Sequence, residues 1–116
     1  MVILSKSASE TSNYLDWLEK KDICIDREKE AYSWAIIDTS KRKYIIALVY
    51  VRSEFFGVSP VIVVETVRVN AVSIYMLPIF PVFHSFHSCH QWLLDVSAEE
   101  FAEFVNSHSK EFLFIC

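Results

Sequence analysis

The period of the hydrophobic positions changes along the chain, and this change separates helical from extended segments. Ser7 and Glu10 have the spacing of a capping box, in which a hydroxyl and a carboxylate satisfy the first free N–H groups of a helix. An apolar stripe at helical spacing follows, made of Tyr14, Trp17 and Leu18. Two lysines then come where the helix dipole favours cations. The pattern predicts a helix over residues 8–21.

Extended segments rich in β-branched and aromatic residues follow the first helix. The predicted strands cover residues 31–38, 43–52, 61–69 and 71–77. The strand over 43–52 is apolar on both of its faces, which predicts a central position covered on both sides of the sheet. A polar turn over 38–41 and a loop over 53–60 separate the strands, and Asn70 marks a bulge or tight turn.

The last third of the chain mixes signals. Pro78 and Pro81 stop regular strand pairing. Residues 84–96 stay open between loop, strand and helix, with a strand over 91–96 as one alternative. Ser97 and Glu100 form a second capping box, which predicts a helix to about residue 107. Residues 112–115 fit an edge strand or a docked tail.

The order of these elements predicts the fold class. The strands are grouped together instead of alternating with helices, which is typical of α+β proteins. We expect an antiparallel sheet of about four to five strands, with an N-terminal and a C-terminal helix packed on one face of it. No repeat, linker or low-complexity stretch interrupts the chain, so residues 1–116 are predicted to form a single globular domain.

Composition and charge narrow the classes of partner. Hydrophobic residues make up 53% of the chain, which is enough to fill a core. There are 11 Lys and Arg residues against 15 Asp and Glu residues, which gives a formal net charge of −4. This mild acidity excludes a typical nucleic-acid binder, because phosphate recognition needs a concentrated basic surface. It is compatible with a basic protein partner.

Cysteine usage and hydropathy predict a cytoplasmic protein. Cys24, Cys89 and Cys116 form an odd set at wide spacing, so no disulfide framework is expected and a reducing compartment fits. The N-terminus lacks the basic and apolar regions of a secretory signal. The uncharged run over 69–94 is interrupted by Asn, Ser, Pro and His residues, so we do not expect it to span a membrane.

A run of histidines carries the first candidate chemistry. His84, His87, Cys89 and His90 offer the imidazole and thiol ligands that zinc prefers. The spacing is not a known zinc pattern. On a helix, side chains at intervals of three residues drift around the axis, so the three histidines would converge poorly. The alternatives are a pH switch, polar and aromatic filler of a surface loop, or a Cys/His nucleophile pair. No supporting catalytic motif accompanies such a pair, and a single glycine cannot build a phosphate-binding loop. An enzyme is the least favoured class.

Two acidic clusters and one aromatic segment are candidate contact surfaces. The predicted helices carry Glu10, Asp16 and Glu19 on the first, and Glu99, Glu100 and Glu103 on the second. Either cluster is a solvated face or a contact surface for a basic partner. Phe80, Phe83 and Phe86 lie in an uncharged segment after Pro78, which is either a partner or homodimer contact or a loop tucked over the core. Glu65 and Arg68 are expected to mark exposed or edge positions of their strand, and the alternative for Glu65 is that it lines a shallow binding groove.

These observations favour a small acidic protein-binding module. Its most favoured form is an inhibitor of a toxic or catalytic protein, such as an immunity protein or antitoxin. Glu99, Glu100 and Glu103, or the segment from Phe80 to Phe86, would contact the partner. One alternative is a metal- or pH-responsive regulator that uses the run from His84 to His90. The other is a secretion-type chaperone, a homodimer that holds an extended segment.

Overall fold

The computed structural model describes residues 2–5, 8–37, 43–54, 57–68 and 71–114. Its strands are β1 (Val2–Ser5), β2 (Tyr32–Ile37), β3 (Lys43–Ser53), β4 (Gly57–Arg68), β5 (Ala71–Pro78) and β6 (Leu113–Phe114). Its helices are α1 (Ala8–Glu19), α2 (Phe86–Asp95) and α3 (Ala98–Ser107).

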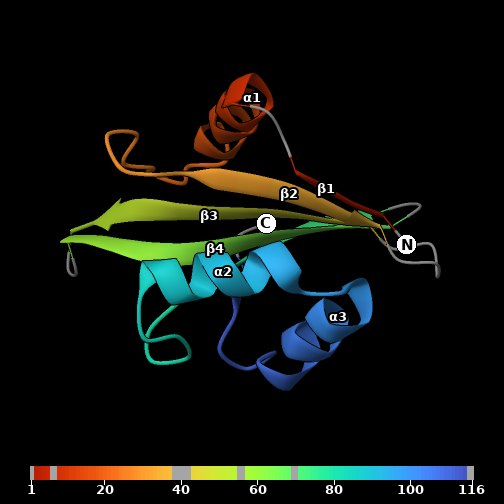
Figure 1. Ribbon diagram of the computed structural model, residues 1–116. Helices are drawn as coiled ribbons and strands as arrows, with labels where there is room; N and C mark the ends of the chain where they lie inside the picture. The colour runs from red at the N-terminus through yellow and green to blue at the C-terminus, as the bar shows by residue number, and fades with distance from the viewer. Residues whose placement is uncertain (1, 6–7, 38–42, 55–56, 69–70, 115–116) are drawn as a thin grey trace.

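The strands form one antiparallel sheet in which each strand pairs with its neighbours along the chain. The order is β1-β2-β3-β4-β5-β6, and α1 is inserted between the first two strands (Figure 1). The predicted antiparallel α+β architecture is confirmed. The described part of the chain adds β1, which the sequence analysis missed because four residues are too few to show a period. It also shows that residues 113–114 pair with β5 as an edge strand.

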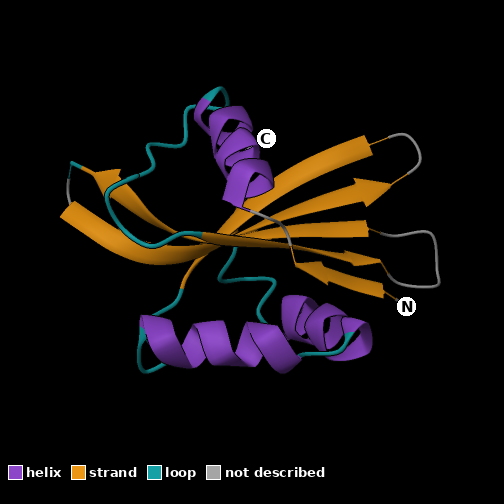
Figure 2. Cartoon of the chain, turned by 45° about the horizontal axis from the view of Figure 1, so that its top comes forward, coloured by secondary structure: helices purple, strands orange, loops and turns teal. Residues whose placement is uncertain are grey.

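Helices cover both faces of the sheet, so the expectation that they share one face is wrong. Figure 2 shows α1 on one side of the strands and α2 with α3 on the other. The reason lies in the two-faced apolar character of β3 and β4, because alternate residues of one strand point to opposite sides. Ile46 and Leu48 enter the core under α2 and α3, whereas Ala47 and Val49 enter the core under α1. All four are fully buried, which confirms the predicted central position of β3.

The first helix is shorter than expected. It ends at Glu19 instead of residue 21, and the chain then turns through Asp22, which has φ 66°. Aspartate is one of the few residues other than glycine that tolerates this left-handed conformation. The stripe predicted from helical spacing faces the sheet, since Tyr14 and Leu18 are buried and Trp17 packs partly buried against the same core; Leu15 beside them is buried as well.

Most of the segment over 84–96 is helical, as α2 spans Phe86–Asp95, so the strand alternative over 91–96 is wrong. Ser85 has extended backbone, and its hydroxyl accepts a hydrogen bond from the Ser88 N–H, which caps α2. Cys89 and Leu93, one helical turn apart, are the residues of α2 that are buried in the core. A second cap starts α3, where the Ser97 hydroxyl accepts a hydrogen bond from the Glu100 N–H as the predicted capping box requires.

The boundary between β3 and β4 also differs from the expectation. The predicted loop over 53–60 is mostly strand, because β4 begins at Gly57 and pairs with β3 from there. Gly57 has φ 67°, a conformation that favours glycine. The predicted turn over 38–41 and the predicted bulge at Asn70 lie outside the described residues. Among the described residues, no helix combines the length and the apolar character that crossing a bilayer would require.

Candidate functional site

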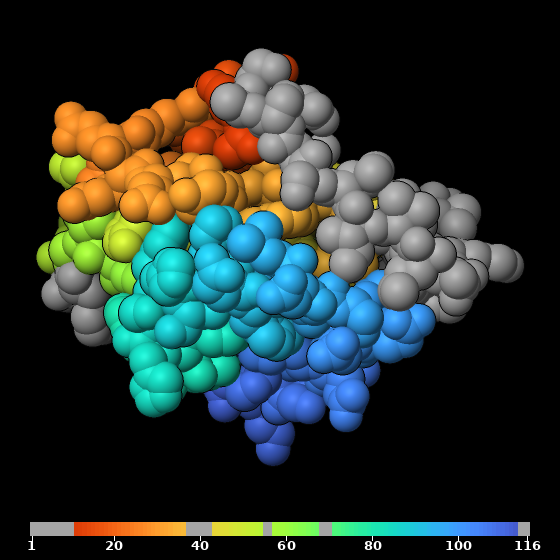
Figure 3. All heavy atoms as spheres, viewed as in Figure 1, coloured from red at the N-terminus to blue at the C-terminus, as the bar shows by residue number. Residues whose placement is uncertain are grey.

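The two C-terminal helices and the segment that precedes them form a layer over one face of the sheet. Figure 3 shows this layer as a continuous surface, coloured from cyan to blue, below the strands. Where α2 ends and α3 begins, the layer carries four carboxylates, which we call the acidic corner: Asp95, Glu99, Glu100 and Glu103. All four are exposed. The predicted acidic outer side of the last helix is therefore present.

The acidic corner differs from the acidic side of α1 in its pairing. Arg27 bonds to both Asp16 and Glu19 and so ties α1 to the segment that follows it. The guanidinium is thereby held between two carboxylates, which raises the pKa of Arg27. The hydrogen bond to Glu19 is the largest cause of this rise. None of the four carboxylates of the acidic corner forms an ion pair within the part of the chain that the structure describes. Glu10 was also assigned to the first cluster, but its side chain lies outside the described part.

The whole net charge of the protein originates in the segment that contains the acidic corner. Residues 69–109 include four carboxylates and no Lys or Arg, which gives −4 with neutral histidines. The rest of the chain holds the other 11 carboxylates and all 11 basic residues, and 11 − 11 leaves no net charge. The charge is thus segregated onto α2 and α3, while the rest of the chain is balanced.

The candidate aromatic segment divides between surface and core. Phe80, which precedes a cis bond to Pro81, is 52% exposed. Phe83 instead packs against Trp92, with 5.4 Å between ring centroids, and Phe86 stacks on Tyr50 at 5.0 Å. Phe80 is therefore the most exposed of these three phenylalanines, and the other two are partly buried. Phe83 fastens the segment to α2, and Phe86 fastens the start of α2 to the sheet.

The histidine run does not converge on one point. His84 and His87 are exposed, whereas Cys89 is fully buried and points into the core. His90 stacks on Tyr32 with 3.9 Å between ring centroids and an interplanar angle of 17°. Within the described ranges, no group of three or more His, Cys, Asp or Glu side chains is arranged to hold a metal ion. The four residues proposed as zinc ligands are therefore not brought together here.

Burial also makes Cys89 a poor nucleophile. Its side chain has no exposed surface, and burial raises the pKa of the thiol to about 12. A thiol with such a pKa is almost entirely protonated at neutral pH, and the thiolate is the reactive form. The sequence could not reveal this, because a cysteine next to histidines has the same appearance whether it faces solvent or the core.

Glu65 is a buried carboxylate, so the expectation that it marks an exposed or edge position is wrong. It lies on β4 between β3 and β5, is only 4% exposed, and accepts a hydrogen bond from Trp17 Nε1 at 3.2 Å. Its face of the strand is the one that packs against α1. Burial of the Tyr14 ring raises the pKa of the Tyr14 hydroxyl, and the negative charge of nearby Glu65 raises it further. The side chain of Arg68 lies outside the described part.

A cleft of about 590 Å³ opens between α1 and α2 beside β2. His90 and Leu94 line it from α2, and Thr11 lines it from α1. The Thr11 and Ser33 hydroxyls, which also line the cleft, share a buried hydrogen bond of 2.8 Å.

The chain was compared with protein-family models, with curated proteins and with solved structures, and it matches none of them.

Proposed function

We propose that this chain is a protein-binding module that presents the acidic corner to a basic partner. Its most specific form is an inhibitor of a toxic or catalytic protein, of the kind that immunity proteins and antitoxins represent. The observation that carries the proposal is the segregation of charge: residues 69–109 hold the entire net charge, and the carboxylates of the acidic corner have no ion pair in the described structure.

The arrangement within α3 supports a contact surface over a merely solvated face. Glu99 and Glu103 are four residues apart on one helix, where like charges repel and opposite charges stabilise. Glu99 and Glu100 gain from the helix dipole in the first turn, but Glu103 lies beyond it. A helix selected only for stability would alternate signs along such a face. Complementary charge on a partner would relieve the repulsion and speed association.

The helical layer also exposes apolar side chains, which can form the apolar centre of an interface that charge alone does not supply. Leu94 is 45% exposed and directly precedes Asp95 at the end of α2. Interfaces combine an apolar centre with a polar rim, so an exposed leucine beside unpaired carboxylates fits the composition of one. Phe80 offers a second exposed apolar side chain in the same helical layer.

The test begins with the partner itself. The untagged chain is purified from cells in which it is naturally produced, and native mass spectrometry identifies what it carries. Hydrogen exchange on the complex then locates the contact. Protection of amides in α3 supports the proposal, and protection confined to α1 and β1 contradicts it. The inhibitor form further requires that the partner's toxicity or catalysis falls on binding.

A neutralised variant then tests the acidic corner. Replacing Glu99, Glu100 and Glu103 by glutamine should slow association with the partner by about 10-fold or more at low salt, because electrostatic steering is lost. The matched control neutralises three other exposed carboxylates, in Asp22→Asn, Glu28→Gln and Glu54→Gln. Both triple variants change the net charge by the same amount. Equal slowing in the two would show that overall charge matters and the acidic corner does not.

A further inference from the structure

The cleft between α1 and α2 adjoins the acidic corner at the end of α2. Leu94 lines the cleft from the last turn of this helix, and the next residue, Asp95, belongs to the acidic corner. Both side chains are exposed, Leu94 by 45%. Figure 3 looks onto this edge of the molecule, where α2 in cyan lies directly below β2 in orange. A protein that contacts the acidic corner therefore meets the cleft beside it.

Aromatic rings in contact with one another line the cleft from β2 and α2. The His90 imidazole lies on the Tyr32 ring with 3.9 Å between centroids, and the Trp34 ring lies 5.7 Å from His90. All three residues line the cleft. Flat rings pack well against such rings, either offset and parallel or edge to face. A planar side chain from another protein would therefore gain more here than a branched aliphatic one.

The side of the cleft near α1 adds apolar surface and one guanidinium. Leu15 lines the cleft from α1, and Arg27 lines it from the segment between α1 and β2. Arg27 is already held by Asp16 and Glu19, so its charge is committed within the chain. A planar guanidinium still packs well against the face of an aromatic ring. The cleft thus favours an aromatic side chain over an acidic one.

We propose that the cleft receives a tryptophan or tyrosine side chain of the basic protein that the acidic corner attracts. This inference rests on the proposed function, which supplies the basic partner. The volume of about 590 Å³ lies within the range of roughly 300–1,000 Å³ that is usual for ligand pockets. Protein interfaces gain most of their affinity from a few aromatic or arginine anchors in such pockets, whereas charges around them mainly speed association.

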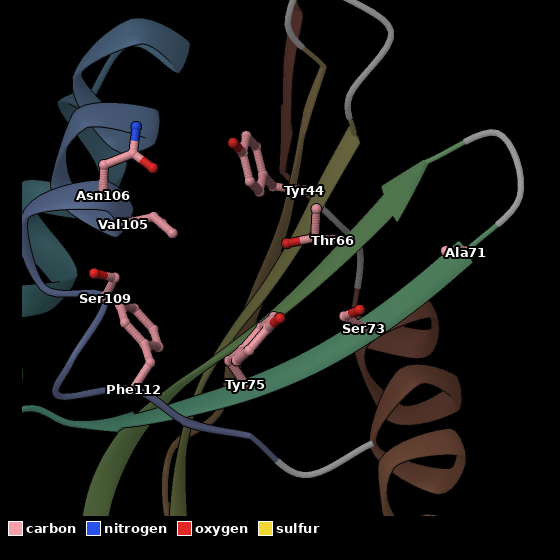
Figure 4. Close-up of a pocket in the computed structure, with 9 residues that line it drawn as sticks. All are labelled: Tyr44, Thr66, Ala71, Ser73, Tyr75, Val105, Asn106, Ser109 and Phe112. Carbon is pink, nitrogen blue, oxygen red and sulfur yellow. The ribbon is translucent and has the colours of Figure 1, made fainter.

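Another pocket provides an internal comparison. It has a volume of about 360 Å³, and Tyr44, Tyr75 and Phe112 are among the side chains that line it (Figure 4). This pocket also offers aromatic rings, but it adjoins the last turn of α3, whereas Glu99 and Glu100 lie in the first turn. An aromatic side chain with basic neighbours should therefore prefer the cleft.

Three acetylated and amidated tripeptides, Lys-Trp-Lys, Lys-Ala-Lys and Glu-Trp-Glu, test the inference in NMR titrations of the chain. Lys-Trp-Lys should bind at least about 10-fold more tightly than either of the others, because it alone combines an aromatic anchor with basic neighbours. The amide signals of Tyr32, His90 and Leu94 should shift, and those of Thr66 and Ser73 in the other pocket should not. Equal affinity of Lys-Trp-Lys and either control peptide overturns the inference, as do shifts confined to the other pocket.

Matched variants locate the binding site of Lys-Trp-Lys. Leu94→Ala should weaken binding by about 5-fold, and Leu113→Ala, which shortens a similarly exposed leucine on β6, should leave it unchanged. Ser12→Phe places a ring in the cleft from an exposed position and should weaken binding by about 10-fold. Asn13→Phe adds the same ring at the next position of α1, beside the described lining, and should have no effect. Unaltered binding in both Leu94→Ala and Ser12→Phe overturns the inference.

Binding kinetics with the partner itself separate this inference from the proposed function. Loss of charge at the acidic corner should slow association, whereas loss of the anchor contact should speed dissociation. Leu94→Ala and Ser12→Phe should therefore raise the dissociation rate by about 10-fold with little change in the association rate. A partner that dissociates from these two variants at the original rate, but associates slowly when Glu99, Glu100 and Glu103 are neutralised, contradicts the aromatic anchor alone. The opposite result contradicts the role of the acidic corner alone.

Discussion

Single residues show most clearly where the pattern of the sequence is ambiguous. Glu65 interrupts an apolar run, and a charged residue in such a run normally marks a solvent-facing position. Its carboxylate accepts a hydrogen bond from Trp17, which lies 48 positions away along the chain. The pattern of residues around Glu65 cannot predict a hydrogen-bond partner that is so distant along the chain. Tyr14, in the same core, has a buried hydroxyl without a hydrogen-bond partner among the described residues, which leaves this polar site incompletely satisfied.

The buried thiol of Cys89 gives a prediction at the same scale. Burial raises its pKa from 9.0 to about 12, so between these values the unfolded chain releases a proton that the folded protein retains. Below about pH 9 the contribution of the neutral thiol to stability is fully present, and it is lost as pH rises toward 12. Urea denaturation from pH 8 to pH 10 should therefore show a fall in the free energy of unfolding that is about 1 kcal/mol smaller in Cys89→Ala than in the original chain. Identical pH dependence of the free energy of unfolding in the two proteins would contradict a raised pKa of the Cys89 thiol.

At the scale of elements, local signals succeeded where they were long and failed where they were short. The central strands and both capping boxes gave helices and strands within a few residues of their observed bounds. The segment now known as α2 stayed ambiguous, because His84, His87 and His90 blur the contrast between its buried and exposed sides. Cys89 and Leu93 are its fully buried residues, and Phe86 and Trp92 pack partly buried against the same core. Three carboxylates of the acidic corner, Glu99, Glu100 and Glu103, were predicted from helical spacing, whereas Asp95 and the lack of ion pairs among the described residues needed the three-dimensional arrangement.

The cap of α3 can be tested by removing one hydroxyl. Ser97→Ala should lower the free energy of unfolding by about 1 kcal/mol, because the Glu100 N–H loses its acceptor at the start of the helix. Chemical denaturation measures the change. Ser107→Ala, at the exposed last residue of the same helix, serves as the control and should change stability by less than about 0.5 kcal/mol. Equal effects of the two substitutions would show that the cap contributes nothing specific.

At the scale of the whole molecule, one sheet is shared by two cores. Helix α1 completes one core and the helical layer completes the other, while β3 and β4 contribute alternate residues to both. The rule that consecutive strands group together was sufficient to predict the antiparallel sheet. It could not assign the helices to faces, because an amphipathic helix fits either side of a sheet whose two faces are both apolar.

Sharing the sheet should make the protein unfold in a single step. Leu18→Ala in α1 and Leu93→Ala in α2 each remove a side chain that is at most 1% exposed, and each should cost about 2–5 kcal/mol. In both variants, tryptophan fluorescence and far-ultraviolet circular dichroism should give coincident denaturation curves. A variant in which one core melts while the other persists, seen as separated curves, would show that the cores are independent.

The short outer strands have a consequence for how the protein behaves at high concentration. The sheet is bordered by β1, with four residues, and β6, with two, whereas β3 and β4 span 11 and 12 residues. An exposed strand edge is a template on which further chains assemble, and its hazard grows with its length. The long apolar strands, which have the composition of amyloid-forming segments, occupy the middle of the sheet. There β3 pairs with β4 along its whole length, and each also pairs with its other neighbour over part of its length. The strand order therefore acts as a barrier to aggregation.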